Sequence, residues 1–326
     1  MIPRVDVVIP TRGRDHLLPA LVVPLLEDPI VNRIIVVDDA HHTGTVSDES
    51  ALSALSPRVE VICTGGAGPA KAREAGAQAS ETEVLLFLDD DVMPEPGIAA
   101  LHSRHHGQSS ELLVCGYTPV IPRPGCRLSP EATVYSQTYE MRRRQYETDG
   151  DVVLTHLWGG NFSLRRDDAL RVGLASESFS RPFHEDRDFG LRCREAGLTA
   201  VFDPAIQAGH LYERQWSVVA KESFSRGDSL VLLHQVHSSV LGPFDPHQFE
   251  QGMPRPLRML VRAANGPLTG RIATGVVTAL GRLGTATHLR FLQINAVRLL
   301  RRTQAARGAH SALLKPTLRA ASAVDH

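Results

Sequence analysis

The apolar positions of the first hundred residues gather into short continuous runs. They are Val5 to Pro10, Arg33 to Val37, Val59 to Thr64 and Val84 to Leu88. Strands of a parallel sheet that is covered on both faces have this pattern, because the side chains on both faces are apolar and do not alternate with polar ones. We therefore expect an α/β fold with a Rossmann-like, mostly parallel mixed sheet and helices on both faces.

The segments between these runs have helical spacing. Residues 17–26 are predicted to be helical, although Pro19 and Pro24 should confine any helix to short pieces. A glycine-rich turn introduces a predicted helix over 70–79, and another is expected over 185–196, where Gly197 ends it.

The pattern loosens after Pro94. It predicts a helix over 135–146, strands over 112–121 and 155–165, and short extended pieces over 199–202 and 206–210. From Ser217 onward the chain is expected to be mainly helical, with a break at 242–246. These elements predict an α/β domain over 1–215, with halves 1–95 and 96–215, and a helical extension over 216–326.

Charge is distributed unevenly along the chain, although the net charge is only −1. Residues 255–326 hold 12 of the 35 Arg and Lys residues and one acid, Asp325, for a charge of +11. The other 254 residues hold 23 basic and 35 acidic residues, for a charge of −12. A segment this basic should meet an anionic surface or pack on the acidic part of its own chain.

Other features bear on the compartment. The N-terminus lacks a basic stretch followed by an apolar one, and the four cysteines lack Cys-x-x-Cys spacing. We therefore expect a cytoplasmic protein without disulfides. Residues 272–300 are moderately apolar, but Arg282, Arg290 and Arg298 interrupt them, so this stretch is not expected to span a membrane.

Three consecutive carboxylates, Asp89, Asp90 and Asp91, follow the fourth apolar run directly. Like charges this close raise one another's pKa, and a divalent cation removes the repulsion. Mg²⁺ and Mn²⁺ favour one or two carboxylates together with phosphate oxygens. In an extended segment Asp89 and Asp91 point the same way. The triplet thus predicts a metal–diphosphate site, and a solvated acidic turn is the alternative.

Two further groups would meet the triplet in a parallel sheet. Asp39 closes the second run, so it should lie at the same edge of the sheet and can accept hydrogen bonds from a base or ribose. Its alternative role is a turn cap. Arg73 lies one turn inside the predicted helix 70–79 and can reach a nucleotide or the Asp cluster, or can simply lie on the surface.

Acidic residues also begin the predicted helix 185–196. Glu185 and Asp186 are favoured there by the helix dipole, but a carboxylate at the start of a helix can also serve as a general base. His210 ends a short extended piece. A lone histidine is more often structural, yet imidazole suits Mn²⁺ beside a carboxylate.

Seven sequence pieces follow one another in order. They are V-V-I-P-T-R-G-R, I-I-V-V-D-D, G-x-x-x-A-R-E-x-G, L-L-F-L-D-D-D-V-M-P, G-G-N-F-S, H-E-D-R-D-F-G-L-R and A-G-H. Their order and spacing, over roughly residues 4–212, resemble the family 2 inverting glycosyltransferases of the GT-A fold. The resemblance implies a nucleotide-binding half over 1–95 and an acceptor-binding half over 96–215.

The resemblance also implies a reaction and a set of site residues. A sugar would pass with inversion from a nucleotide-diphosphate sugar, UDP-sugar favoured, to an acceptor hydroxyl, with Mn²⁺ or Mg²⁺ as cofactor. The residues implied at the donor are Pro10, Thr11, Arg14, Asp39, Arg73, Asp89, Asp90, Gly160 and Asn161. The implied metal ligands are Asp91, Asp89 and His210. Asp186 would be the catalytic base, with Glu185 beside it.

The sequence departs from the family pattern at two places, where Glu74 follows Arg73 and Ala40 follows the Asp pair. Two alternatives remain beside the transferase. A sugar-phosphate nucleotidyltransferase would need a longer glycine-rich loop than residues 10–14 provide, and a catalytically inactive GT-A-like binding protein would not need the carboxylates.

Partners follow from the same reasoning. The acceptor can be lipid-linked, a small molecule, a peptide or a glycan, and no nucleic acid is expected. The basic C-terminal region can contact the inner face of a membrane peripherally, form a homo-oligomer or pack on the catalytic domain.

Overall fold

The computed structural model describes residues 2–40, 49–179 and 183–315, which form two compact units. The first unit comprises Met1–Leu128, Tyr135–Ser180 and Glu185–Tyr212. The second comprises Ser129–Val134, Arg181–His184 and Glu213–His326. Residues 316–326, the end of the predicted helical extension, lie outside the described residues.

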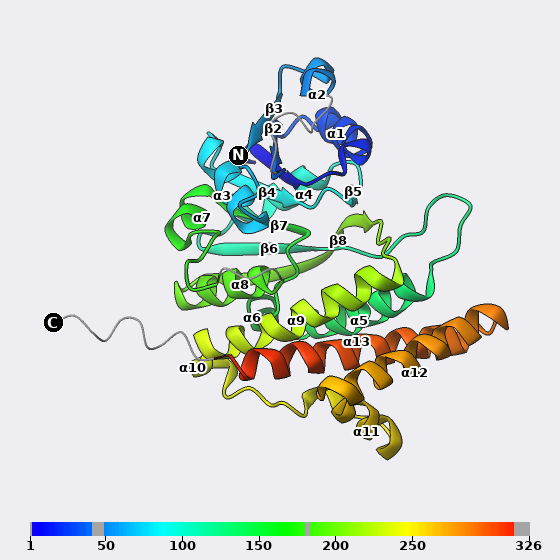
Figure 1. Cartoon of the computed structure of the whole chain (residues 1–326). Helices are drawn as coiled ribbons and strands as arrows, with labels where there is room; N and C mark the ends of the chain where they lie inside the picture. The colour runs from blue at the N-terminus through cyan, green and yellow to red at the C-terminus, as the bar shows by residue number, and fades with distance from the viewer. Residues whose placement is uncertain (1, 41–48, 180–182, 316–326) are drawn as a thin grey trace. The chain divides into compact units, whose positions relative to one another are not determined.

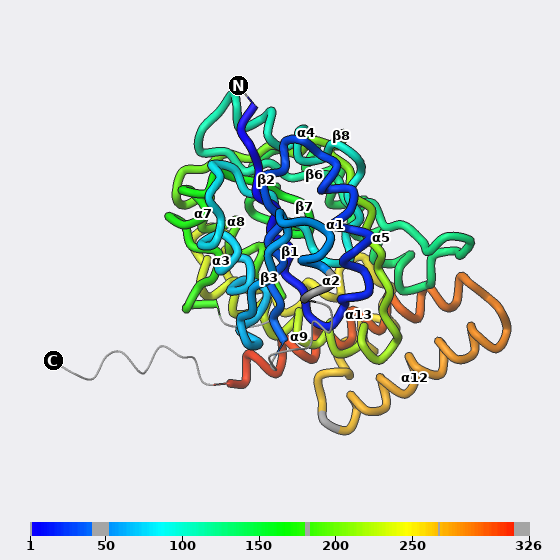
Figure 2. The backbone as a smooth tube through the Cα atoms, turned by 90° about the horizontal axis from the view of Figure 1, so that it is seen from above, coloured from blue at the N-terminus to red at the C-terminus, as the bar shows by residue number. Residues whose placement is uncertain are grey.

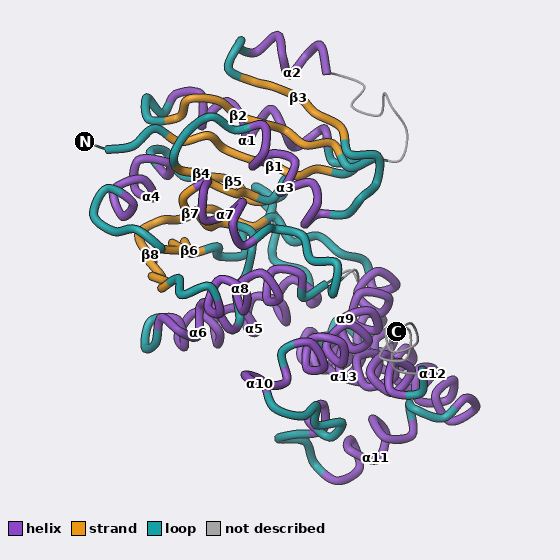
Figure 3. The backbone as a smooth tube through the Cα atoms, turned by 90° about the vertical axis from the view of Figure 1, so that its left-hand side faces the viewer, coloured by secondary structure: helices purple, strands orange, loops and turns teal. Residues whose placement is uncertain are grey.

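The first unit is built on an eight-stranded sheet with the order β3-β2-β1-β4-β7-β6-β8-β5 (Figures 1 and 3). Its strands are β1 (Val5–Thr11), β2 (Val31–Asp38), β3 (Val59–Cys63), β4 (Val84–Leu88), β5 (Val92–Pro94), β6 (Leu112–Tyr117), β7 (Asn161–Arg165) and β8 (Thr199–His210). Strands β3, β2, β1 and β4 are parallel to one another, as β6 is to β8. Antiparallel pairing joins β7 to β4 and β6, and β5 to β8. The predicted mostly parallel mixed sheet is confirmed.

Helices cover both faces of this sheet, as predicted. Val7 and Ile9 of β1 are fully buried on one face, in a core that also takes side chains from α1 (Leu18–Glu27), α2 (Glu49–Leu55) and α4 (Ile98–His106). Val8, between them, is buried on the other face. That core includes residues of α3 (Pro69–Ala79), α5 (Pro130–Tyr146), α6 (Gly150–Thr155), α7 (Arg166–Val172) and α8 (Glu185–Glu195). Strands β1 and β4 are thus buried on both sides along their whole length, which explains their apolar runs.

Asp6 is the one charged residue of β1, and its side chain is fully buried. It accepts hydrogen bonds from the Ser80 hydroxyl at 2.7 Å, the Asn32 amide at 3.0 Å and the Glu81 backbone N–H at 3.0 Å. Burial would raise the pKa of Asp6, but these donors outweigh it and hold the pKa below its usual value. The carboxylate therefore connects β1 to β2 and to the loop that leads into β4.

The prediction that prolines would break the first helix into pieces was wrong. Helix α1 runs unbroken from Leu18 to Glu27, with Pro19 in its first turn, where a missing N–H loses no intrahelical bond. Pro24 lies inside the helix and removes one bond close to its end. The buried side chains of Leu18, Leu21, Val22 and Leu25 compensate by packing in the core.

Other boundaries also differ from prediction. The strand expected over 155–165 begins only at Asn161, because residues 156–160 form the loop between α6 and β7. Strand β6 ends at Tyr117 rather than at residue 121. The two extended pieces expected over 199–210 are one strand, β8, with an irregular register opposite Gly116 and Tyr117. The short elements β5, α2, α4, α6 and α7 were not predicted.

The second unit is helical, as the sequence predicted. Its helices are α9 (Trp216–Val236), α10 (Ser238–Leu241), α11 (Arg255–Ala263), α12 (Pro267–Ala286) and α13 (Arg290–Leu313), with a break from Gly242 (Figures 1 and 2). Helix α13 packs along both α9 and α12. Its Leu300 is fully buried with Val219 of α9 and Val277 of α12, and these side chains form the core of the unit.

Glycines allow α9 and α13 to approach closely. A Cβ atom on Gly308 of α13 would collide with the carbonyl oxygen of Phe224, and one on Gly227 of α9 would collide with that of Ala305. The two backbones are therefore in direct contact, and neither position can hold a side chain unless the helices move apart.

We expect Gly308→Ala to destabilise the protein by about 1–3 kcal/mol, because the methyl group would overpack the contact between α9 and α13. The matched control is Gly275→Ala in α12, where a Cβ meets nothing within 4 Å. That variant should be stabilised by up to about 1 kcal/mol, since alanine loses less backbone entropy in a helix. Urea denaturation of the full chain measures both, and equal gains in stability would contradict the close contact.

Candidate functional site

The carboxyl ends of β1, β2 and β4 meet at one edge of the sheet and form a continuous polar network. The Asp39 N–H after β2 donates to the carbonyl oxygen of Thr11 at 2.9 Å. The Thr11 hydroxyl in turn donates to Asp90 Oδ2 at 2.9 Å. Residues that lie 79 positions apart are therefore in direct contact.

Arg14, in the loop after β1, neutralises two of the three consecutive carboxylates. Its Nη1 donates to Asp90 Oδ1 and, at 2.7 Å, to Asp91 Oδ2. Both carboxylates are about 95% buried. Burial raises the pKa of Asp90, although Arg14 opposes this effect. The repulsion that the sequence suggested a metal would relieve is thus partly relieved by an arginine.

Arg73 of α3 joins the third carboxylate to the start of α8. Its Nη2 donates to Asp89 Oδ1 at 2.6 Å, and its Nη1 donates to Asp186 Oδ1 at 3.1 Å. Burial of the guanidinium opposes its charge, but Asp186 and Asp89 outweigh this and hold the pKa of Arg73 above its usual value. The structure therefore brings together three predicted site residues from three different elements.

Asp186 has a second fixed partner. Its Oδ2 accepts a hydrogen bond from the Gly159 N–H at 3.1 Å, and a Cβ atom on Gly159 would collide with the carboxylate. Glu185 lies next to it as the first residue of α8 and adds to the negative charge around Arg73. Just before this helix, Phe183 and His184 have positive φ angles of 69° and 66°. Such angles are strained for residues other than glycine, and strain of this kind gathers at functional sites.

Asp89 lies at the centre of these charges with its side chain 36% exposed. The pKa of Asp89 is raised to about 6, chiefly by desolvation. The nearby Asp186 and Asp91 raise it further, and Arg73 offsets only part of the rise. A carboxylate with this pKa is held in a site that carries excess negative charge.

The pairing of β5 with β8 places His210 beside Asp91. Val92 lies opposite His210 in the ladder, and the Leu211 N–H donates to the carbonyl oxygen of Asp91 at 2.8 Å. His210 Nε2 lies 3.4 Å from Asp91 Oδ1. The imidazole is flanked edge-on by the rings of Tyr135 and Tyr212, with centroids 5.2 and 5.7 Å away.

These positions fit a divalent cation that is completed by other oxygens. Neighbouring ligands of an octahedral Mg²⁺ lie about 3 Å apart, so Asp91 and His210 can serve one ion together. Asp89 turns instead to Arg73, and the described residues contain no group of three or more His, Cys, Asp or Glu side chains placed to hold a metal. The four aspartates exceed the two arginines that pair with them by two negative charges.

The remaining predicted donor residues occupy different positions. Asp39 accepts hydrogen bonds from the Thr64 hydroxyl at 2.7 Å and the Gly68 N–H at 2.9 Å, so it also holds the glycine turn before α3. The Gly160 carbonyl accepts the Asp89 N–H at 3.2 Å. Pro10 is buried within β1, opposite Val37 of β2.

Asn161 is not brought into this cluster. Its side chain is fully buried, and its Oδ1 lies 2.9 Å from His102 Nε2 beneath β7. Burial lowers the pKa of His102 to about 3 and that of His106 to about 4, so both imidazoles are neutral at physiological pH. Both rings also lie 2.8 Å from the Ser163 hydroxyl. These contacts join α4 to β7 inside the core of the first unit.

Sequence reasoning missed several residues that shape the site. Gly159 and the aromatic side chains of Tyr135, Trp158 and Tyr212 were not singled out. The Trp158 indole donates to the Tyr135 hydroxyl at 2.9 Å, and the Tyr135 and Tyr212 rings stack at 4.0 Å. The adjacent glycines 159 and 160 were the available signal, because two glycines before a strand indicate a close backbone approach.

Comparison with known proteins identifies sequence relatives. The family described as Glycosyl transferase family 2 matches residues 6–170. An uncharacterized glycosyltransferase, YfnE of Bacillus subtilis (strain 168), is 23% identical over 51% of this chain and 53% of its own length. Validoxylamine A glucosyltransferase of Streptomyces hygroscopicus subsp. limoneus is 28% identical over 60% of this chain and 49% of its own length. The chain thus spans about half the length of these curated relatives.

Solved structures share the fold at low sequence identity. The mannosyltransferase PcManGT from Pyrobaculum calidifontis, in complex with GDP-Man and Mn²⁺, aligns with a TM-score of 0.57 and 16% identity. That alignment covers 94% of this chain and 87% of the other. GalNAc-T7 with UDP, GalNAc and Mn²⁺ aligns with a TM-score of 0.51 and 15% identity, over 75% of this chain and 53% of the other. The expected GT-A fold is confirmed.

The raised pKa of Asp89 predicts a pH dependence of folding in the absence of divalent cations. The folded chain holds this proton up to a pH of about 6, whereas the ordinary value is 3.8. Ionisation of Asp89 therefore opposes folding. The stability of the wild type relative to Asp89→Asn should fall as the pH rises from about 4 to about 6, and should level off above that range.

Urea denaturation in the presence of a chelator, repeated across this pH range, measures the difference between the two proteins. A difference that instead increases with pH would mean that Arg73 outweighs desolvation and that the anion of Asp89 stabilises the fold.

Proposed function

We propose, since this chain belongs to glycosyl transferase family 2, that it transfers a sugar from a nucleotide-diphosphate sugar to an acceptor hydroxyl. The favoured donor is a UDP-sugar, and the anomeric centre is inverted. The chain spans only part of its curated relatives, so neither their donors nor their acceptors are carried over to it.

The observation that carries this proposal is the bridge that Arg73 forms between Asp89 and Asp186. It holds the carboxylate cluster at the end of β4 within one ion-pair network with the carboxylate at the start of α8. A displacement at an anomeric carbon needs a leaving diphosphate on one side and a general base on the other. The network keeps candidates for both tasks at a fixed separation.

Asp186 is the proposed base. One oxygen accepts from Arg73 and the other from the Gly159 N–H, so the carboxylate cannot rotate freely. Each carboxylate oxygen has a second lone pair for an acceptor hydroxyl, and the side chain is 28% exposed. The carboxylate takes the hydroxyl proton while the acceptor oxygen bonds the anomeric carbon on the face opposite the diphosphate. The bond from that carbon to the diphosphate breaks, the nucleoside diphosphate leaves, and the centre is inverted.

The donor would be held at the ends of β1, β2 and β4. Asp91 and His210 are the proposed protein ligands of Mn²⁺ or Mg²⁺, which when bound offsets the charge on the leaving diphosphate. Thr11, Arg14 and Asp39 are the proposed nucleotide contacts. Arg14 is 32% exposed, so its guanidinium can turn from the carboxylates towards phosphate oxygens.

The first prediction for this site concerns nucleotide binding. Calorimetric titration with UDP, GDP and dTDP, each with and without Mn²⁺, should show metal-dependent binding of one nucleotide to the wild type. Asp91→Ala should lose that dependence, because the variant removes a proposed ligand. The matched control is Asp167→Ala, on the exposed side of α7, which should bind as the wild type does. Binding of no nucleotide under any condition would leave an inactive relative of the family.

The second prediction separates chemistry from binding. Asp186→Asn retains an oxygen that can accept from Arg73, so donor affinity should stay within a few-fold of the wild type. Transfer should fall by about 10²–10⁴-fold, because the amide cannot accept the proton. Turnover of the donor, followed by nucleotide release, measures this effect against Asp167→Asn as control. Unchanged turnover would remove Asp186 from the mechanism.

A further inference from the structure

Helix α12 in the second unit exposes a row of large apolar side chains. Leu268, Ile272, Val276 and Leu283 are 69%, 59%, 42% and 52% exposed. Their spacing of four, four and seven residues places them on one face of the helix. Scattered exposed leucines need no explanation, but an aligned row on one helix indicates a surface that meets an apolar partner.

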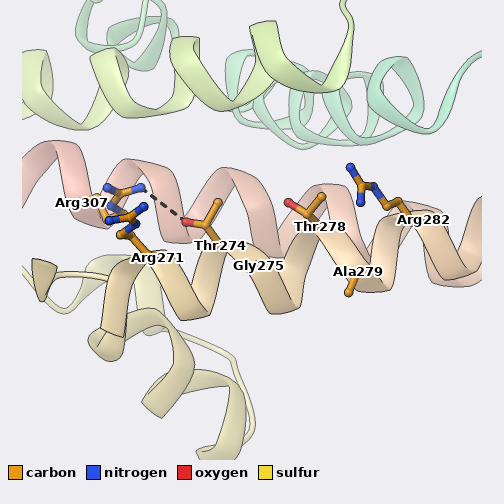
Figure 4. A pocket seen from close by; sticks show the side chains of 7 residues that line it. All are labelled: Arg271, Thr274, Gly275, Thr278, Ala279, Arg282 and Arg307. Carbon is orange, nitrogen blue, oxygen red and sulfur yellow. Dashed lines mark hydrogen bonds between the residues drawn. The ribbon is translucent and has the colours of Figure 1, made fainter. Parts of the chain in front are cut away.

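An arginine-lined groove of about 630 Å³ lies along the same helix (Figure 4). Arg271, Thr274, Thr278 and Arg282 of α12 line it together with Arg307 of α13. Arg271 and Arg282 each precede a member of the apolar row by one residue, so both flank the row on the same side.

Most of the polar groups in this groove remain available to a ligand. Arg307 donates to the Thr274 hydroxyl and to Gln304 Oε1, at 3.4 and 3.2 Å. Within the described part of the chain, Arg271 and Arg282 form neither a hydrogen bond nor an ion pair. From Arg255 to Lys315 the sequence holds eleven basic residues and no Asp or Glu. The charge of the groove is therefore not neutralised from within its own segment.

We propose that this face of α12 binds the surface of an anionic phospholipid bilayer. The apolar row would lie at the boundary between headgroups and acyl chains, and the arginine groove would take lipid phosphate groups. A helix with an apolar row flanked by arginines is suited to lie in the plane of such a surface. None of the helices in the described ranges is long and apolar enough to cross a bilayer, so the contact is peripheral.

A second copy of the chain fits this face less well. A two-fold interface places the same patch of each partner against itself. Arg271 and Arg282 of one copy would then meet those of the other, with no acid in the segment to pair with them, and such like-charge contacts are strongly unfavourable. An anionic surface satisfies both the row and the groove. The proposal does not depend on the proposed reaction, since it concerns only the second unit.

Co-sedimentation of the full chain with lipid vesicles tests this contact. Vesicles of phosphatidylcholine with one third phosphatidylglycerol should bind the chain, and pure phosphatidylcholine should bind it far more weakly. The Arg271→Gln/Arg282→Gln variant should bind the anionic vesicles about 25-fold more weakly, because each basic side chain near the surface contributes about fivefold at low salt. Leu268→Ser/Ile272→Ser should lose the part of the binding that persists at high salt.

The matched control is Arg104→Gln/Arg127→Gln, which removes the same charge from exposed positions in the first unit and should bind as the wild type does. Thermal unfolding by circular dichroism should be unchanged in the Leu268→Ser/Ile272→Ser variant, since both side chains are mostly exposed. Retained donor binding, measured separately, keeps this result distinct from the proposed function.

Three outcomes would overturn the proposal. Equal losses in the control and in Arg271→Gln/Arg282→Gln would mean that net charge alone drives binding. Displacement from the vesicles by inorganic phosphate at constant ionic strength would identify the groove as a site for a soluble anion. A lipid-free dimer in sedimentation velocity that dissociates in Leu268→Ser/Ile272→Ser, without vesicle binding by the wild type, would make this face an interface between copies.

Discussion

The Arg73 guanidinium lies almost fully buried between Asp89 and Asp186, and the geometry of the site follows from this placement. A buried charge is tolerated only where opposite charges and hydrogen bonds replace the lost water. Arg73 thus depends on both carboxylates, which are themselves partly exposed. The carboxyl end of β4, the start of α8 and the first turns of α3 are therefore held in one arrangement. Arg14 repeats this logic on the other side of the cluster, against Asp90 and Asp91.

The order of strands in the sheet makes this arrangement possible. Parallel pairing brings the carboxyl ends of β1, β2 and β4 to one edge, where each strand delivers a polar residue. Antiparallel β7 then runs away from that edge beside β4, so the loop before it, with Gly159 and Gly160, lies against Asp186 and Asp89. The short strand β5 returns along β8 and sets His210 beside Asp91. Polar residues at or directly after the ends of β1, β2, β4 and β8 thus converge.

The helical unit follows a different rule, in which small residues and charge decide what is buried and what is exposed. Glycines at 227 and 308 let α9 and α13 touch along their backbones. Helix α12 packs on α13, and its opposite side is exposed. Its uncovered side carries apolar residues and arginines together. The sequence alone indicated a basic segment that meets an anionic partner or the acidic part of its own chain, but not which arginines are unpaired. That distinction depends on Arg262 pairing with Glu250 and on Lys315 pairing with Asp228. Among the residues that the structure describes, Arg271 and Arg282 pair with no acid.

Local physics in the sequence determined the first four strands, the presence of helices on both faces of the sheet and the chemistry at the strand ends. Continuous apolar runs and strand-terminal carboxylates depend on neighbouring residues alone. The folded structure decided which of these groups meet. The Asp89 side chain pairs with Arg73, and the Asn161 side chain lies in a buried network with His102. Partners at the site lie up to 113 residues apart, and the competition for buried hydrogen bonds selects them. A different balance keeps α1 intact through Pro24, because the burial of four apolar side chains outweighs one lost backbone hydrogen bond. Sequence spacing carries no record of these long-range balances, so only the tertiary structure could settle them.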